Sequence, residues 1–142
     1  MRTLIEIAMV FATGLVPKAW YVGEVAAHFE VDRDLAMLTW KYESSYGTDL
    51  YGDWDEELGE YLAVGDWQIH PGTWLYLVEK YDEAYGCPET WYDLDTRLDF
   101  EAATIISMYA FSIGREDWWA GARLARLKLE EDRKAVVELE VP

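Results

Sequence analysis

Residues 32–47 read DRDLAMLTWKYESSYG, and this stretch decides the fold expected for the chain. Asp32 is a typical helix N-cap, because its side chain can accept hydrogen bonds from the first unpaired backbone amides of a helix. Apolar side chains then recur on one helical face, beginning with Leu35 and Leu38. Gly47 is a residue type that commonly ends a helix. We therefore predict a helix from Asp32 to the neighbourhood of Gly47.

The same criteria, applied outward along the chain, predict a mainly α domain. Five further helices are expected at residues 4–15, 20–29, 71–81, 99–113 and 118–127. Between residues 48 and 65 glycines and acidic residues interrupt the pattern, which indicates an irregular loop or a small β-hairpin. After residue 127 the helix could continue, or Val137, Leu139 and Val141 could form a terminal strand. We expect one domain spanning residues 1–142, with a polar excursion between its third and fourth helices.

The composition excludes several classes of protein. The chain has 142 residues, 51% of them hydrophobic, so a core can form. It carries 12 Lys and Arg against 28 Asp and Glu, a formal charge of −16. That charge argues against nucleic-acid and anionic-membrane partners, whose affinity depends on cations. One cysteine and two histidines, distant from one another in sequence, predict neither a metal site nor a bound cofactor.

The first residues resemble an export signal only briefly. Glu6 interrupts the apolar stretch, and Pro17 follows where a small-residue cleavage site is expected. No apolar run reaches the ~18 residues that span a bilayer. We therefore expect no signal peptide and no membrane-spanning segment.

Glu43 differs from the other acidic residues. Eight of them fall between Lys41 and Lys80, a stretch with no other Lys or Arg, and a solvated acidic loop is the simplest interpretation of these eight. Glu43 instead comes at the end of the predicted helix, where the helix dipole disfavours a negative charge. Its aromatic neighbours Trp40, Tyr42 and Tyr46 should partly desolvate it. Both effects raise a carboxyl pKa, as a general acid working near neutrality requires.

Two segments resemble one enzyme family. Residues 25–47 end in the pair Glu43-Ser44, and residues 65–74 read GDWQIHPGTW. Together they are similar to the start and the second signature, Gly-x-x-Gln-Ile, of the soluble lytic transglycosylase and goose-type lysozyme catalytic domain. The resemblance covers about residues 20–125. It implies a lysozyme-like α+β fold and cleavage of the β-1,4 bond between N-acetylmuramic acid and N-acetylglucosamine in peptidoglycan, as a muramidase or lytic transglycosylase.

The resemblance also implies roles for individual residues. Glu43 corresponds to the catalytic acid, and Gln68 and Ile69 to the sugar-binding segment. The family's final tyrosine-asparagine pair is replaced here by Asp117-Trp118-Trp119, which leaves Tyr109 as the candidate for a tyrosine near the acid. Other residues are assigned to substrate binding: Ser44, which could instead cap a backbone group, and the rings of Tyr46, Tyr61 and Trp67, which could stack on sugars.

The second catalytic group is left open. A hydrolase needs a second carboxylate about 5–9.5 Å from the acid, and the candidates are Asp53, Asp55 and Asp66. A lytic transglycosylase needs none, because the muramyl 6-hydroxyl attacks and an anhydro product forms.

Two alternatives remain at this point. The chain could be a non-catalytic lysozyme-like module that binds the wall or belongs to a virion, or the same fold could act on chitin or chitosan. For the enzyme we expect a monomer that binds glycan strands. The absence of an export signal favours a bacteriophage endolysin made in the host cytoplasm and released by a separate pore, or a virion-associated enzyme.

Overall fold

The computed structural model describes residues 1–140, which form a mainly helical protein with one small sheet. Six α-helices occur in this part of the chain, together with short 3-10 helices. In order, the elements are α1 (Leu4–Ala12), α2 (Lys18–His28), α3 (Arg33–Ser44), β1 (Tyr51–Asp55), β2 (Glu60–Val64), α4 (Pro71–Tyr85), η1 (Glu89–Tyr92), η2 (Leu94–Leu98), α5 (Phe100–Ser112), η3 (Glu116–Trp118) and α6 (Ala120–Glu140).

The predicted starts of three helices are confirmed by the caps that the structure shows, whereas the helices predicted from residues 20 and 118 begin at Lys18 and Ala120. Asp32 Oδ1 accepts hydrogen bonds from the backbone amides of Asp34 (2.9 Å) and Leu35 (3.2 Å), which begins α3. Pro71 occupies the first turn of α4, where its missing N–H costs nothing. Asp99 caps α5 by accepting from Ala102 N at 3.0 Å.

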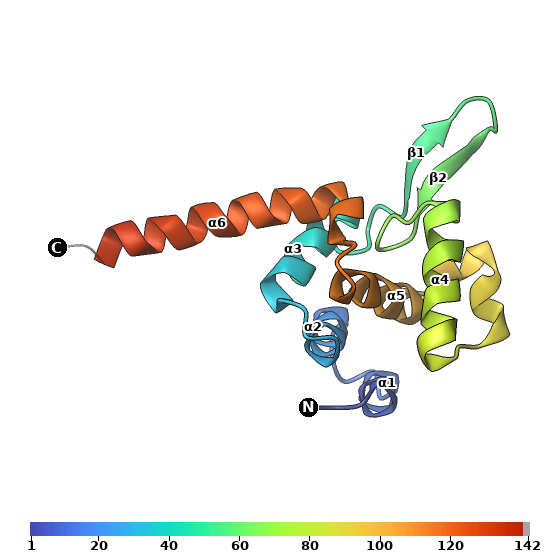
Figure 1. Ribbon diagram of the computed structural model, residues 1–142, viewed down its shortest axis with the longest axis horizontal. Coiled ribbons are helices and arrows are strands. Elements are labelled where there is room, and N and C mark those ends of the chain that lie inside the picture. Colours follow the sequence, from blue (N-terminus) through green and yellow to red (C-terminus); the bar gives the residue numbers. More distant parts are fainter. Residues whose placement is uncertain (141–142) are drawn as a thin grey trace.

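Helix α5 forms the centre of the fold (Figure 1). Nine of its thirteen residues are buried, so it is apolar on almost every side. Helices α2 and α4 pack against it, and the buried rings of Tyr21, Trp74 and Tyr81 complete one hydrophobic core. Helix α3 packs on α2 and, most extensively, on α6.

The polar excursion is a β-hairpin. β1 and β2 pair antiparallel, with Tyr51 opposite Val64 and Asp55 opposite Glu60. The hairpin projects from the body near the start of α4 (Figure 1). Arg97 holds its base: the buried guanidinium donates to the carbonyl oxygens of Leu62 (2.9 Å) and Ile69 (2.8 Å). The sequence left open whether this region was a loop or a hairpin, and the structure decides for the hairpin.

The C-terminal segment differs from one of the two expectations. α6 continues as a helix to Glu140, so the strand through Val137 and Leu139 is wrong, and Val141 lies outside the described residues. The last turns of α6 extend away from the body (Figure 1). The apolar alternation was misleading because these side chains are exposed and pack against no sheet. No helix within residues 1–140 is long and apolar enough to cross a membrane.

Candidate functional site

Glu43 lies in the last turn of α3, against the first turn of α6. The backbone N–H of Gly121 donates a 2.7 Å hydrogen bond to Glu43 Oε1. Any side chain at position 121 would displace this carboxyl, because a Cβ there would lie 2.8 Å from Oε1 and 3.1 Å from the carboxyl carbon. The packing of α3 against α6, together with the hydrogen bond from Gly121, therefore fixes the half-buried carboxyl of Glu43.

The surroundings of Glu43 raise its pKa. Burial is the largest influence and raises the pKa, and the negative charge of Asp53 acts in the same direction. The Gly121 hydrogen bond and the positive charges of Arg123 and His70 lower it by less. The predicted direction is confirmed. The N-terminus of α6, whose dipole favours a carboxylate, lies at the same place, so burial outweighs it.

Glu43 is on the wall of a cavity of about 330 Å³ between the hairpin and the start of α6. β1 contributes Asp53, and the turn after β2 contributes Gln68 and His70. Trp118 lies on the side of η3 and α6. The Nε2 of His70 donates to Asp53 Oδ2 across 2.7 Å, which holds the carboxylate at the edge of the cavity. The carboxyl groups of Glu43 and Asp53, the amide of Gln68 and the imidazole of His70 thus line the same cavity.

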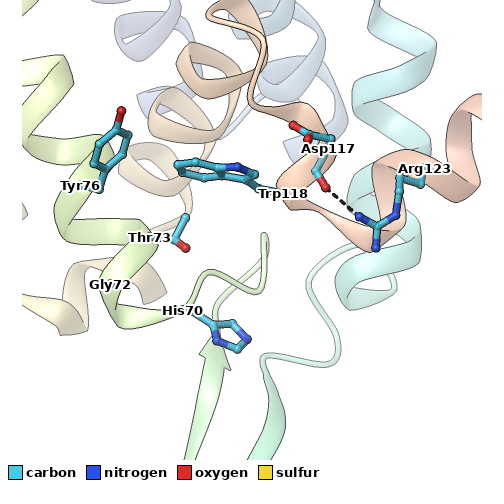
Figure 2. Close-up of a pocket in the computed structure, with 7 residues that line it drawn as sticks. All are labelled: His70, Gly72, Thr73, Tyr76, Asp117, Trp118 and Arg123. Atoms are coloured by element: carbon cyan, nitrogen blue, oxygen red, sulfur yellow. Dashed lines mark hydrogen bonds between the residues drawn. The ribbon is translucent and has the colours of Figure 1, made fainter.

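A second cavity of about 590 Å³ adjoins the first, and His70 and Trp118 line both. Figure 2 shows the indole of Trp118 reaching toward Tyr76 and Thr73 of α4, with Arg123 on the opposite side. The rings of Tyr76 and Trp118 are 5.5 Å apart at a tilt of 57°. The two cavities form one groove with an exposed aromatic pair at one end and Glu43 at the other.

Backbone strain is concentrated around this groove. Of the five non-glycine residues with positive φ within residues 1–140, Asp53 (52°) and Gln68 (49°) line the first cavity. Ser45 (51°) and Tyr46 (59°) form the tight turn immediately after Glu43. Such conformations cost about 1–3 kcal/mol each and accumulate at functional sites. Strained backbone conformations thus occur at Asp53 and Gln68 themselves and in the turn that follows Glu43.

Three predicted site residues are brought together: Glu43, Asp53 and Gln68. Gln68 is positioned by its own hydrogen bond, in which Nε2 donates to Gly65 O at 3.0 Å. Gly52 makes room for the amide, since a Cβ there would lie 2.4 Å from Gln68 Oε1. These residues belong to different elements, so their convergence depends on the tertiary fold.

The two other carboxylates proposed as catalytic groups lie elsewhere. Asp66 is buried and does not line the cavity; Trp40 Nε1 donates to its Oδ2 at 2.9 Å, and Lys18 Nζ is 3.7 Å from the same oxygen. Asp55 is at the hairpin turn, where its Oδ1 accepts from Leu58 N at 2.9 Å. Both carboxylates stabilise local structure.

Four residues predicted to bind substrate are buried in the structure and do not line either cavity, so these predictions are corrected. Trp67 is fully buried and its indole N–H donates to Thr104 Oγ1 at 2.9 Å. Ile69 and Tyr109 are core residues. Ser44 Oγ accepts from Gly47 N at 2.8 Å, which is the capping alternative rather than support for Glu43. Each side chain gains more by burial or capping than a solvent-facing position would give.

Tyr46 and Tyr61 are exposed, as expected for rings that could contact a ligand, but they lie outside the two cavities. Tyr46 packs edge-on against Trp40, with ring centroids 5.1 Å apart. Tyr61 packs against Trp54 on the hairpin, at 4.9 Å. Neither ring lines the cavity that contains Glu43.

The sequence analysis assigned no site role to several residues that line the groove, among them His70, Tyr76, Trp118 and Arg123. Trp118 was given no role in the site, yet 43% of it is exposed. Its acidic neighbours gave no usable signal, because Trp119 follows the same acidic residues and is buried. His70 and Arg123 carried no signal, because only folding brings them to Glu43.

Among residues 1–140, no three His, Cys, Asp or Glu side chains are grouped so that they could hold a metal ion. Comparisons of the chain with family models, with curated proteins and with solved structures gave no match. The geometry of the groove and the two sequence segments are therefore the observations that bear on function.

Proposed function

We propose that this protein is a peptidoglycan-cleaving glycosidase of lysozyme-like fold, which cuts the β-1,4 bond between N-acetylmuramic acid and N-acetylglucosamine with Glu43 as the general acid. One observation carries the proposal: a half-buried carboxyl with a raised pKa shares an open cavity with a second carboxylate. A helical body with a hairpin between the third and fourth helices is compatible with the lysozyme-like fold that the sequence resemblance implies.

The geometry suits proton donation by Glu43. Gly121 N–H occupies Oε1, so the other carboxyl oxygen is available to carry the proton. The raised pKa keeps the group protonated at a higher pH than an ordinary glutamate. Transfer of this proton to the glycosidic oxygen lets the leaving sugar depart as an alcohol, while positive charge develops at the anomeric carbon.

Asp53 is the second carboxylate of the proposed reaction. It lines the same cavity as Glu43, and His70 Nε2 fixes one of its oxygens at 2.7 Å. We propose that Asp53 accepts a proton from the attacking water, so that the product has a reducing end. The transglycosylase route needs no second carboxylate, so the placement of Asp53 at the cavity, in a strained backbone conformation, supports hydrolysis.

The test compares the wild type with Glu43→Gln on purified peptidoglycan, with products identified by mass spectrometry. Glu101→Gln is the matched control, because burial also raises the pKa of Glu101, but that residue lies on α5 away from the groove. We expect the wild type and Glu101→Gln to release the same disaccharide fragments. Glu43→Gln should lose about two orders of magnitude or more in rate, as expected when a general acid is removed.

Several results would contradict parts of the proposal. Equal rates for Glu43→Gln and wild type would exclude Glu43 as the acid. Anhydro ends in the products would show that the muramyl 6-hydroxyl, and not water, attacks the anomeric carbon, and would remove the proposed role of Asp53. Cleavage of chitosan alone would change the substrate, and a folded wild type that cleaves no polysaccharide would favour the binding module.

A further inference from the structure

The larger of the two cavities, next to the one that contains Glu43, is lined by one arginine, Arg123. Arg123 lies on the side of the Trp118 indole away from α4 (Figure 2). One of its N–H groups donates to the backbone oxygen of Asp117 at 2.9 Å, which orients the guanidinium. A guanidinium has five N–H donors, so several remain for a ligand.

Arg123 forms no ion pair with any carboxylate of residues 1–140. Arg33, Arg97 and Arg115 form none either, and Arg123 is the one of these four that lines the cavity. Its neighbour Arg126 on the same helix pairs with Glu116, and Arg133 pairs with Asp32 at 3.0 Å. An arginine that is oriented by a carbonyl and faces a cavity is available to bind an external anion, and its planar fork matches a carboxylate in particular.

The opposite wall of this cavity is aromatic. Trp118 and Tyr76 are both more than one-third exposed, and Arg115 lies over the indole with its guanidinium carbon 5.2 Å from the ring centroid. Flat apolar faces of sugar rings pack well against exposed aromatic side chains, which bury area at little cost in side-chain entropy. The cavity, about 590 Å³, is therefore bounded by an aromatic surface on one side and a cation on the other.

We propose that this second cavity binds a sugar residue that bears a carboxylate, with the sugar against Trp118 and Tyr76 and the carboxylate on Arg123. The inference extends the proposed glycan substrate and therefore rests on it. It selects acidic glycans over chitin, whose residues are neutral, and over chitosan, whose residues are cationic. In peptidoglycan the carboxylate has two sources: the lactyl group of a peptide-free muramyl residue, or the stem peptide attached to it.

Binding is measured by calorimetry on the Glu43→Gln protein, which keeps each glycan intact. The probes are chitotetraose, the peptide-free tetrasaccharide of alternating N-acetylglucosamine and N-acetylmuramic acid, and the same tetrasaccharide with its stem peptides. We expect an acidic tetrasaccharide to bind about tenfold more tightly than chitotetraose, the size of one charge-assisted contact. A preference confined to the peptide-free form identifies the lactyl carboxylate, and one confined to the substituted form identifies the peptide.

Two variants in the same background locate the contact. Arg123→Gln should bind acidic and neutral tetrasaccharides equally, whereas Lys134→Gln removes the same charge from an exposed part of α6 and should preserve the tenfold preference. Trp118→Ala should weaken all three glycans to a similar extent.

The proposal is overturned if chitotetraose binds as tightly as both acidic glycans, or if Arg123→Gln keeps the preference. These results say nothing against Glu43, whose role is read separately from turnover. Conversely, a selective binder without turnover would refute the enzyme and retain the carboxylate site.

Discussion

At the scale of single residues, burial and charge give Glu43 its proposed role. Its position at the end of a helix could be predicted from residues 32–47 alone, and so could the direction of its pKa shift. The responsible contact could not, because Gly121 is 78 positions away. Trp67 and Trp118 likewise show that local sequence does not reveal tertiary contacts. Both lie in polar surroundings in the sequence, yet one is buried and the other lines the groove, and only packing decides between them.

The raised pKa of Glu43 predicts the pH dependence of cleavage. A general acid must be protonated, so kcat/KM should fall as the pH rises through the pKa of Glu43. Because burial raises that pKa, the descending limb should lie above the range of an ordinary glutamate. Arg123 lowers the pKa, so Arg123→Gln should move the limb to higher pH. A pH profile of kcat/KM for both proteins checks this, and a shift to lower pH would contradict the assigned electrostatics.

Gly121→Ala should disable the site without unfolding the protein. The new Cβ would lie 2.8 Å from Glu43 Oε1, so the flexible side chain must move. A displacement of about 1 Å can cost ~100-fold in rate, while alanine gains up to about 1 kcal/mol of helix propensity over glycine.

Gly23→Ala is the control for this prediction. Its Cβ would meet the end of the Arg33 side chain at 2.6 Å, a contact of the same kind but away from the groove. Both variants should unfold cooperatively near the wild-type temperature, and only Gly121→Ala should lose activity. Wild-type kcat in Gly121→Ala would show that the position of the carboxyl is not critical.

At the scale of elements, local signals were sufficient where an element begins with its own cap. Asp32 and Pro71 predicted the starts of α3 and α4 correctly, because capping depends on neighbours in sequence. The continuation of α6 to Glu140 was not predictable from the alternating apolar residues. The hairpin was left undecided for a related reason. Much of its stability comes from Arg97, whose bonds reach backwards over more than 25 residues to the carbonyls of Leu62 and Ile69.

Arg97→Met should therefore destabilise the hairpin and the turn that carries Gln68 and His70. Three backbone carbonyls, including Leu94 O at 2.9 Å, would lose their donor. Loss of such buried partners costs about 1–3 kcal/mol each, so we expect at least ~3 kcal/mol in the free energy of unfolding. Urea denaturation measures it. Lys134→Met, on an exposed turn of α6, should change stability by less than ~0.5 kcal/mol, and a similarly small effect for Arg97→Met would remove Arg97 as the anchor.

At the scale of the whole molecule, the net negative charge should repel an acidic glycan, whereas Arg123 in the groove should attract it. The chain carries −16, and its acidic hairpin stands beside the groove that is proposed to receive an acidic polymer. Long-range repulsion is screened by salt, since the Debye length falls from about 30 Å at 0.01 M to about 8 Å at 0.15 M. The Arg123 contact operates at short range inside a cavity, where salt screens much less. The slow step at low salt should therefore be approach to the substrate, not binding in the groove.

This balance predicts an unusual response to ionic strength. Between about 0.01 and 0.15 M salt, kcat/KM on intact peptidoglycan should rise several-fold, because screening removes the repulsion between two anions. Chitotetraose is neutral, so its affinity for Glu43→Gln should be insensitive to the same change. Turnover of suspended peptidoglycan and calorimetry with chitotetraose across a salt series check the two arms. A monotonic fall of kcat/KM with salt would mean that attraction to a cationic patch, and not repulsion by the acidic surface, governs the encounter with the wall.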